Sequence, residues 1–340
     1  MRTRAGRHSR GMDLVRSAAV AASAATAGLG ITWPATGAGN PLDHPGRPFS
    51  SALADYPDGW ANWLFLTGAL VALTAALWPR RAVVVAAVVA LLCLMDASTL
   101  MAAGYLPAVL VGSLFGLGEA KMSLLFSPGL LVQLLLLTSV AAFGALLARR
   151  VTVSDDLARA TARTRRWTRI AVEAPLVYAL TRVLMFFHVP GFDMFPFGSA
   201  VLWAGLGLAV SASLGAWLTC GLVRPWGEVF PRWLPWLRGR RVPIRLAVVP
   251  GLLVAVMVLT ASKDLFLSLG DGGLDALTEW PLVALPGFLW PLWAFALAMA
   301  TANYGIRRAL AEAKISKRHD APEMVYLPST GTQSPKISGN

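Results

Sequence analysis

Long apolar runs separated by short polar turns cover most of the chain and predict its fold class. A helix needs about 20 apolar residues to cross a bilayer. Eight segments approach that length, near 15–33, 60–78, 82–103, 127–148, 168–189, 199–222, 244–266 and 283–305. The pattern predicts an all-α, polytopic transmembrane helix bundle in a single domain over 15–305. A basic N-terminus over 1–14 precedes the bundle, and 306–340 is expected to be a disordered cytoplasmic tail rich in Ser, Thr, Pro and Lys.

Basic residues predict how this bundle is oriented. Of the 30 Lys and Arg residues, 26 lie before the first segment, after the last, or in every second connection between segments. Such residues accumulate on the cytoplasmic side of membrane proteins, so both termini are expected in the cytoplasm. The net charge of +12 therefore does not indicate a nucleic-acid partner, because the Arg clusters stand between apolar runs.

Three parts of this topology have specific features. The Ala-rich first segment behind an Arg-rich start is either a retained helix or a cleaved signal peptide. The apolar run within 104–126 is too short for a comfortable span, so it is expected to be an outer interfacial helix or a re-entrant segment. In the last segment, Pro281, Pro286 and Pro291 predict a late start or a kink near Pro291.

The eight segments also divide into two groups of four with the same plan. Residues 78–90 loosely echo 238–250. Because four is an even number, such a 4+4 repeat would be parallel, related by an axis along the membrane normal.

Three ionisable residues fall within the expected spans and form the candidate intramembrane polar site: Asp96, Glu173 and Arg182. Asp96 and Arg182 each lie 14 residues beyond the cytoplasmic start of their segment, about 21 Å deep. They are expected either to pair across the bundle or to reach the outer surface separately. Glu173 either pairs locally with Arg169, four residues earlier, or faces an inner cavity as a proton or cation site.

The cytoplasmic loop 223–245 interleaves Trp and Arg residues, and its prolines at 225, 231 and 235 exclude a long regular helix. Indole rings prefer the headgroup level, and Arg is attracted to anionic lipid. The lipid bilayer, and its anionic inner-leaflet lipids in particular, are therefore the expected partner; a protein docking site is the alternative. The candidate interface residues are Arg224, Trp226, Arg232, Trp233 and Trp236.

Catalytic and cofactor templates find little support in the sequence. Cys93 and Cys220 lie in apolar runs without CxxC spacing, and the four histidines lack metal-ligand spacing. No Gly-rich phosphate loop or paired metal-binding carboxylates are found. No metal site and no cofactor are therefore expected.

Two stretches, E-A-P-L-V-Y-A-L-T-R at 173–182 and R-P-W-G-E-V-F-P-R-W-L-P at 224–235, resemble a group of uncharacterised multi-pass membrane proteins of actinobacteria. The resemblance implies a bacterial plasma membrane and no particular activity. Three interpretations of function remain open: a transporter-like or permease-like bundle with inward charges, a membrane enzyme acting on a lipid or isoprenoid, and a non-catalytic scaffold or sensor partner.

Overall fold

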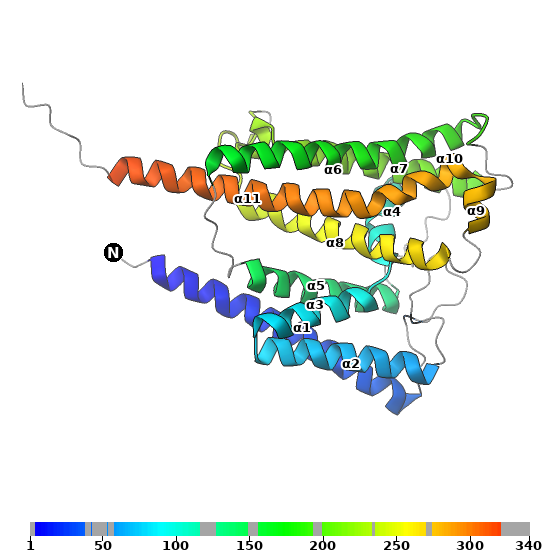
Figure 1. Ribbon diagram of the computed structural model, residues 1–340, viewed down its shortest axis with the longest axis horizontal. Helices are drawn as coiled ribbons and strands as arrows, with labels where there is room; N and C mark the ends of the chain where they lie inside the picture. The colour runs from blue at the N-terminus through cyan, green and yellow to red at the C-terminus, as the bar shows by residue number, and fades with distance from the viewer. Residues whose placement is uncertain are drawn as a thin grey trace, which may run out of the picture.

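The computed structural model describes residues 4–37, 42, 53, 58–115, 127–148, 156–192, 199–232, 235–269 and 274–320. Its long helices are α1 (Arg4–Thr36), α2 (Asp58–Leu77), α3 (Arg81–Leu94), α4 (Ser98–Phe115), α5 (Pro128–Ala148), α6 (Leu157–Phe186), α7 (Ser199–Cys220), α8 (Ile244–Ser268) and α11 (Trp290–Asp320) (Figure 1). Shorter turns of helix are η2 (Pro225–Gly227), α9 (Leu274–Glu279), α10 (Pro281–Ala284) and η4 (Leu285–Leu289). Within these ranges the only β-pairing is an isolated bridge between Val229 and Arg241.

Six stretches, in α1, α2, α5, α7, α8 and α10 to α11, are long and apolar enough to cross a membrane. Helices α3 and α4 pass the same test only together, as a pair bent by 64°. The predicted all-α bundle with several membrane-crossing helices is confirmed to this extent.

The outward faces of these helices carry large apolar side chains. Leu180 is 57% exposed, Trp203 63% and Val210 58%. Soluble proteins rarely expose apolar surface of this kind on many neighbouring helices. The arrangement suggests that lipid covers these faces.

The helices form two groups that follow the two halves of the chain. In the N-terminal half α2 packs on α1 and α3, and α5 packs on α1 and α3. In the C-terminal half α11 packs on α6 and α8, and α7 packs on α6. Figure 1 shows α4 running across the long helices, from the end of α3 toward α7, so that it bridges the two halves. The parallel 4+4 repeat itself stays a prediction.

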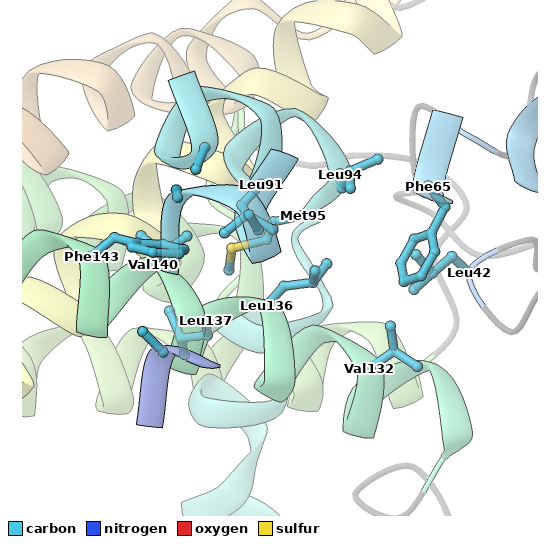
Figure 2. Packing of buried hydrophobic residues seen from close by; sticks show 14 of the residues in the cluster. Leu42, Phe65, Leu91, Leu94, Met95, Val132, Leu136, Leu137, Val140 and Phe143 are labelled. Carbon is cyan, nitrogen blue, oxygen red and sulfur yellow. The ribbon is translucent and has the colours of Figure 1, made fainter. Parts of the chain in front are cut away.

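Two main apolar cores follow the two halves, and Met257 of α8 also joins the N-terminal one. Figure 2 shows Leu91 and Met95 at the centre of the N-terminal core, with Leu136 and Phe143 of α5 around them. Leu91, Met95, Leu136 and Phe143 are all fully buried. The C-terminal core is built by α6, α8 and α11 around Val258. The bend between α3 and α4 therefore begins in a tightly packed environment.

Three predicted boundaries were wrong. The segment expected over 82–103 is broken after Leu94, and the next helix runs on to Phe115 through the first half of 104–126. Residues 116–126 lie outside the described part. The expected tail over 306–340 is helical as far as Asp320, because α11 continues with helix-forming residues and an ion pair from Arg308 to Glu312. Residues 321–340 lie outside the described part.

Two helix starts can also be compared with the prediction. The late start of the last helix is confirmed, because α10 and η4 precede α11, which begins at Trp290. Helix α6 begins at Leu157, well before the expected 168. The additional N-terminal turns of α6, before residue 168, carry the exposed Arg159 and Arg165.

Candidate polar site at a broken helix

The break between α3 and α4 consists of Met95, Asp96 and Ala97, and all three are buried. Met95 is extended, with φ −78° and ψ 149°. One oxygen of Asp96, Oδ1, accepts hydrogen bonds from the backbone N–H and the hydroxyl of Ser98. Asp and Ser make such local bonds in competition with a continuing helix, which explains why the chain stops and restarts here.

Helix α8 supplies a cation to the end of α3. The ammonium of Lys263 donates to the carbonyl of Cys93 at 3.0 Å and also to the carbonyl of Met95. Carbonyls at the end of a helix lack intrahelical partners and carry partial negative charge. Lys263 therefore compensates the end of α3 in place of the missing helical N–H groups.

The next residue of α8, Asp264, supplies an anion to the start of α4. Its Oδ2 accepts a hydrogen bond of 2.7 Å from the backbone N–H of Ala97. Its Oδ1 lies 3.2 Å from the Lys263 ammonium, an ion-pair contact without hydrogen-bond alignment. The Asp264 side chain is 2% exposed, and that of Lys263 is 26% exposed.

Helix α5 of the N-terminal half also contacts the break, through Gln133. The Gln133 side chain is fully buried, and its Oε1 accepts a 3.2 Å hydrogen bond from the backbone N–H of Asp96. Its amide nitrogen donates to the Leu94 carbonyl at 3.5 Å. From the other side, the Thr260 hydroxyl of α8 lies 3.5 Å from the Asp96 carbonyl. Both halves of the bundle thus hold the same few residues of broken backbone.

The charges of this site do not balance when every group is ionised. Two buried carboxylates lie here with one ammonium: Asp264 pairs with Lys263, whereas the Asp96 carboxylate is held by hydrogen bonds from Ser98. The facing residues of α5 and α4, Gln133 and Thr99, are neutral. Burying an uncompensated charge is costly. Thr99 adds a hydroxyl that is buried and has no hydrogen-bond partner.

The structure places the three residues predicted from sequence in three different environments. Asp96 lies in the break. Glu173 is exposed and pairs with Arg169 at 2.7 Å, which is the local pair considered as one of its two alternatives. The Arg182 guanidinium lies 4.8 Å from the Tyr178 ring centroid and donates to the Met185 sulfur at 3.1 Å.

The ion pairs among described residues do not include one between Asp96 and Arg182. Of the two alternatives left open for Asp96 and Arg182, the pair across the bundle is thus not found among the described residues. Equal depth along two helices was a poor guide, because α3 ends at Leu94 and Asp96 therefore does not lie on a continuous straight helix. Asp96 instead caps its own backbone, and α8 brings the nearest charges.

Sequence reasoning missed Gln133, Lys263 and Asp264. A signal was present, because Lys263 and Asp264 are adjacent near the end of an otherwise apolar run, and Asp-Ala-Ser at 96–98 interrupts another. Gln133 gave a weaker signal, since a single amide is tolerated in many membrane helices.

The predicted interface in the 223–245 loop is also only partly at the surface. Arg224, Arg232 and Trp236 are exposed, and Trp233 lies outside the described residues. Trp226, however, stacks on Trp217 of α7, with ring centroids 5.1 Å apart and planes at 21°. Its ring is thus partly buried against α7, and its role at the inner leaflet stays a prediction.

No family model, curated protein or solved structure matches the chain. The functional assignment therefore rests on the geometry of the broken helix.

Proposed function

We propose that the protein is a proton-dependent membrane carrier with eight membrane crossings and both termini in the cytoplasm of a bacterial plasma membrane. The eight crossings are the six apolar stretches, the bent pair α3–α4 and the apolar part of α6. In support, Figure 1 places the start of α1, the starts of α6 and α8 and the end of α11 at one end of the bundle. These are the elements that carry the basic clusters.

The observation that carries the proposal is a broken span held by both halves of the bundle. In many carriers, discontinuous helices at the interface of two helix groups form the binding site, with the free helix ends facing the ligands. Here the free carbonyls of α3 and the free N–H groups of α4 meet at Asp96, between α5 and α8.

A proton fits this site better than a metal cation does. The place that a sodium ion would take, at the free carbonyls of α3, is occupied by the Lys263 ammonium. The excess negative charge remains on Asp96 and Asp264. One proton would neutralise it without displacing Lys263.

Protonation of Asp264 would weaken the contact between α8 and the start of α4, and so the contact between the two halves. A neutral carboxyl group accepts a weaker hydrogen bond from Ala97 than a carboxylate does. It also no longer attracts Lys263 as an anion, which leaves that ammonium with the carbonyls of Cys93 and Met95. Helix α4 could then move against α8, and it would carry α7 with it, because the Ser211 hydroxyl of α7 donates to the Gly104 carbonyl of α4.

A second candidate function is a non-transporting membrane scaffold. It is favoured by the internal partners of the three charged groups, since Asp96, Lys263 and Asp264 are all engaged within the chain. The lipid-enzyme interpretation gains no such observation. Its two proposed acids, Asp96 and Glu173, lie in different halves, and Glu173 is exposed and ion-paired.

Sided cysteine labelling distinguishes a carrier from a scaffold without knowledge of the substrate. The variant Thr99→Cys, in a Cys93→Ser, Cys220→Ser background, places a thiol at a buried position beside the break. A membrane-impermeant maleimide is applied to right-side-out and to inverted vesicles at several pH values. Trp236→Cys, at an 88% exposed position, serves as the control for sidedness and is expected to react only from the cytoplasmic side.

A carrier must expose its site to each side in turn. We therefore expect Thr99→Cys to react from both sides, with a ratio of the two rates that changes with pH. If Thr99→Cys is unreactive from both sides at every pH while Trp236→Cys reacts normally, the proposed carrier function is wrong and the scaffold function is favoured.

A further inference from the structure

The connection between α7 and α8 is an ordered hairpin, here called the 221–243 hairpin, of which 233–234 lie outside the described residues. Phe230 donates to the Arg240 carbonyl at 3.0 Å, and Gly239, with φ +71°, donates back to the Phe230 carbonyl at 3.3 Å. Val242 donates to the Glu228 carbonyl at 2.9 Å. The hairpin thus accommodates Pro225, Pro231 and Pro235, which exclude a long regular helix.

Helix α11 holds this hairpin in place. The Tyr304 hydroxyl is buried and donates to the Gly227 carbonyl at 2.7 Å. Arg307 pairs with Glu228 at 2.7 Å, and Arg308 donates to the Val242 carbonyl at 3.2 Å. The hairpin is therefore a fixed surface.

The free side of this hairpin combines one large indole with unpaired positive charge. Trp236 is 88% exposed at the tip. Six exposed arginines lie along the hairpin and at the start of α8: Arg224, Arg232, Arg238, Arg240, Arg241 and Arg245. None of them pairs with a carboxylate of the described residues, and the hairpin's own Glu228 is engaged by Arg307.

We propose that the 221–243 hairpin binds the phosphate groups of anionic phospholipids in the cytoplasmic leaflet, with Trp236 inserted at the headgroup level. The hairpin directly joins Cys220 at the end of α7 to Ile244 at the start of α8, and both helices are apolar enough to cross a membrane. A membrane surface is therefore always within its reach. Arg binds phosphate oxygens with paired N–H donors, and Trp prefers the interface.

Membrane binding explains the composition better than a protein partner does. A protein interface needs apolar side chains at its centre, ringed by polar ones. Among the described residues of the tip, the exposed Trp236, with Leu237 at its side, stands among guanidinium groups without carboxylate partners, which matches a planar anionic surface. The inference does not depend on the carrier function, because it uses only α7, α8 and the hairpin.

The test uses the full-length protein in nanodiscs with increasing fractions of phosphatidylglycerol in phosphatidylcholine. The phosphatidylglycerol carries bromine atoms near the headgroup end of its acyl chains, and these quench nearby indoles. The chain has 13 tryptophans, so the signal of interest is the quenching lost in Trp236→Phe. The charge variant is Arg238→Gln, Arg240→Gln, Arg241→Gln, and its matched control removes three exposed cations elsewhere at the same end, Arg159→Gln, Arg165→Gln, Lys314→Gln.

We expect the Trp236-dependent quenching to saturate at a low fraction of phosphatidylglycerol. The charge variant should need roughly ten- to a hundredfold more of this lipid, while the control stays near wild type. An unchanged titration in the charge variant would overturn the proposal. So would equal Trp236 quenching by brominated phosphatidylcholine alone, which would show insertion without charge recognition, or no Trp236 quenching at all, which would leave the hairpin free for a protein partner.

Discussion

The Asp264 carboxylate accepts a hydrogen bond of 2.7 Å from the backbone N–H of Ala97, 167 residues away in the chain. Asp264 belongs to the C-terminal half and Ala97 to the bent helix pair of the N-terminal half. The first N–H groups of a helix have no intrahelical partner, so this carboxylate replaces one for α4. The break is therefore maintained by contacts between the halves, and changes in α8 should alter the N-terminal half.

Replacing Lys263 by Met is expected to destabilise the protein by roughly 3 kcal/mol, at the lower end for a broken buried ion pair, because Lys263 is partly exposed. The change leaves Asp264 uncompensated and removes the donor to the carbonyls of α3. The double variant Lys263→Met, Asp264→Asn should be more stable than Lys263→Met alone. Thermal unfolding in detergent measures both, with Lys314→Met as the exposed control. A double variant as unstable as the sum of the single changes would contradict the coupling.

Gln133→Leu tests the contribution of α5. The substitution keeps the approximate volume of this buried side chain but removes the acceptor for the Asp96 N–H. An unsatisfied buried N–H costs about 1–3 kcal/mol, so the unfolding temperature should fall. The neighbouring change Leu134→Ala, at a position facing outward, should have a smaller effect. The reverse order of the two effects would show that the break does not depend on Gln133.

Exchanging the charges of Asp96 and Arg182 should not restore stability. Asp96→Arg alone places a cation against the N-terminus of α4 and next to Lys263, so it should unfold the protein or strongly reduce its yield. Adding Arg182→Asp cannot compensate, because Arg182 lies over Tyr178 in the other half. Yield and monodispersity after detergent extraction give the readout. Recovery in the double variant to the level of wild type would revive the cross-bundle pair.

Two glycines distinguish helix packing from helix propensity. A Cβ on Gly251 would lie 2.7 Å from the Thr301 hydroxyl oxygen of α11, whereas one on Gly144 would meet no atom within 4 Å. Gly144→Ala should be neutral or stabilise by up to about 1 kcal/mol, through helix propensity. Gly251→Ala should destabilise by about 1–3 kcal/mol, because α8 and α11 must separate. Equal melting temperatures for the two variants would contradict the close packing.

Tyr304→Phe should release the 221–243 hairpin from α11. The loss of one buried hydroxyl leaves the Gly227 carbonyl without its donor and removes a partner of Arg308. We expect trypsin to cleave at the exposed Arg238, Arg240 and Arg241 several-fold faster, with Tyr105→Phe as the control. The proposed attachment would be refuted by identical cleavage rates in the two variants.

The helices were largely predictable, because apolar runs of membrane length leave few alternatives. The expected spans 60–78, 127–148 and 244–266 agree with α2, α5 and α8 within two residues at each end. The break after Leu94 was not predicted, since hydropathy averages over Asp96 and Ser98 and reports one continuous run. The 4+4 repeat expected from the shared plan of the halves stays a prediction.

The polar site was only partly predictable for a related reason. A charge within an apolar run identifies a residue that needs a partner, and this argument found Asp96. It cannot say which helix supplies that partner, because helix packing is decided by many small contacts far apart in the chain. Matching depths along straight helices suggested Arg182 as a partner of Asp96. In the structure, Lys263 and Asp264 instead bind the backbone at the break.

The most direct test of the account is whether Asp264 takes up a proton in the folded protein. Infrared difference spectra between acidic and neutral pH, recorded on the reconstituted protein, detect the C=O stretch of a buried protonated carboxyl group. We predict such a band in wild type and in the surface control Glu173→Gln, and its loss in Asp264→Asn. If Asp264→Asn shows the same pH-dependent band as wild type, or if wild type shows none, the broken helix is not a proton site and the proposed carrier loses its basis.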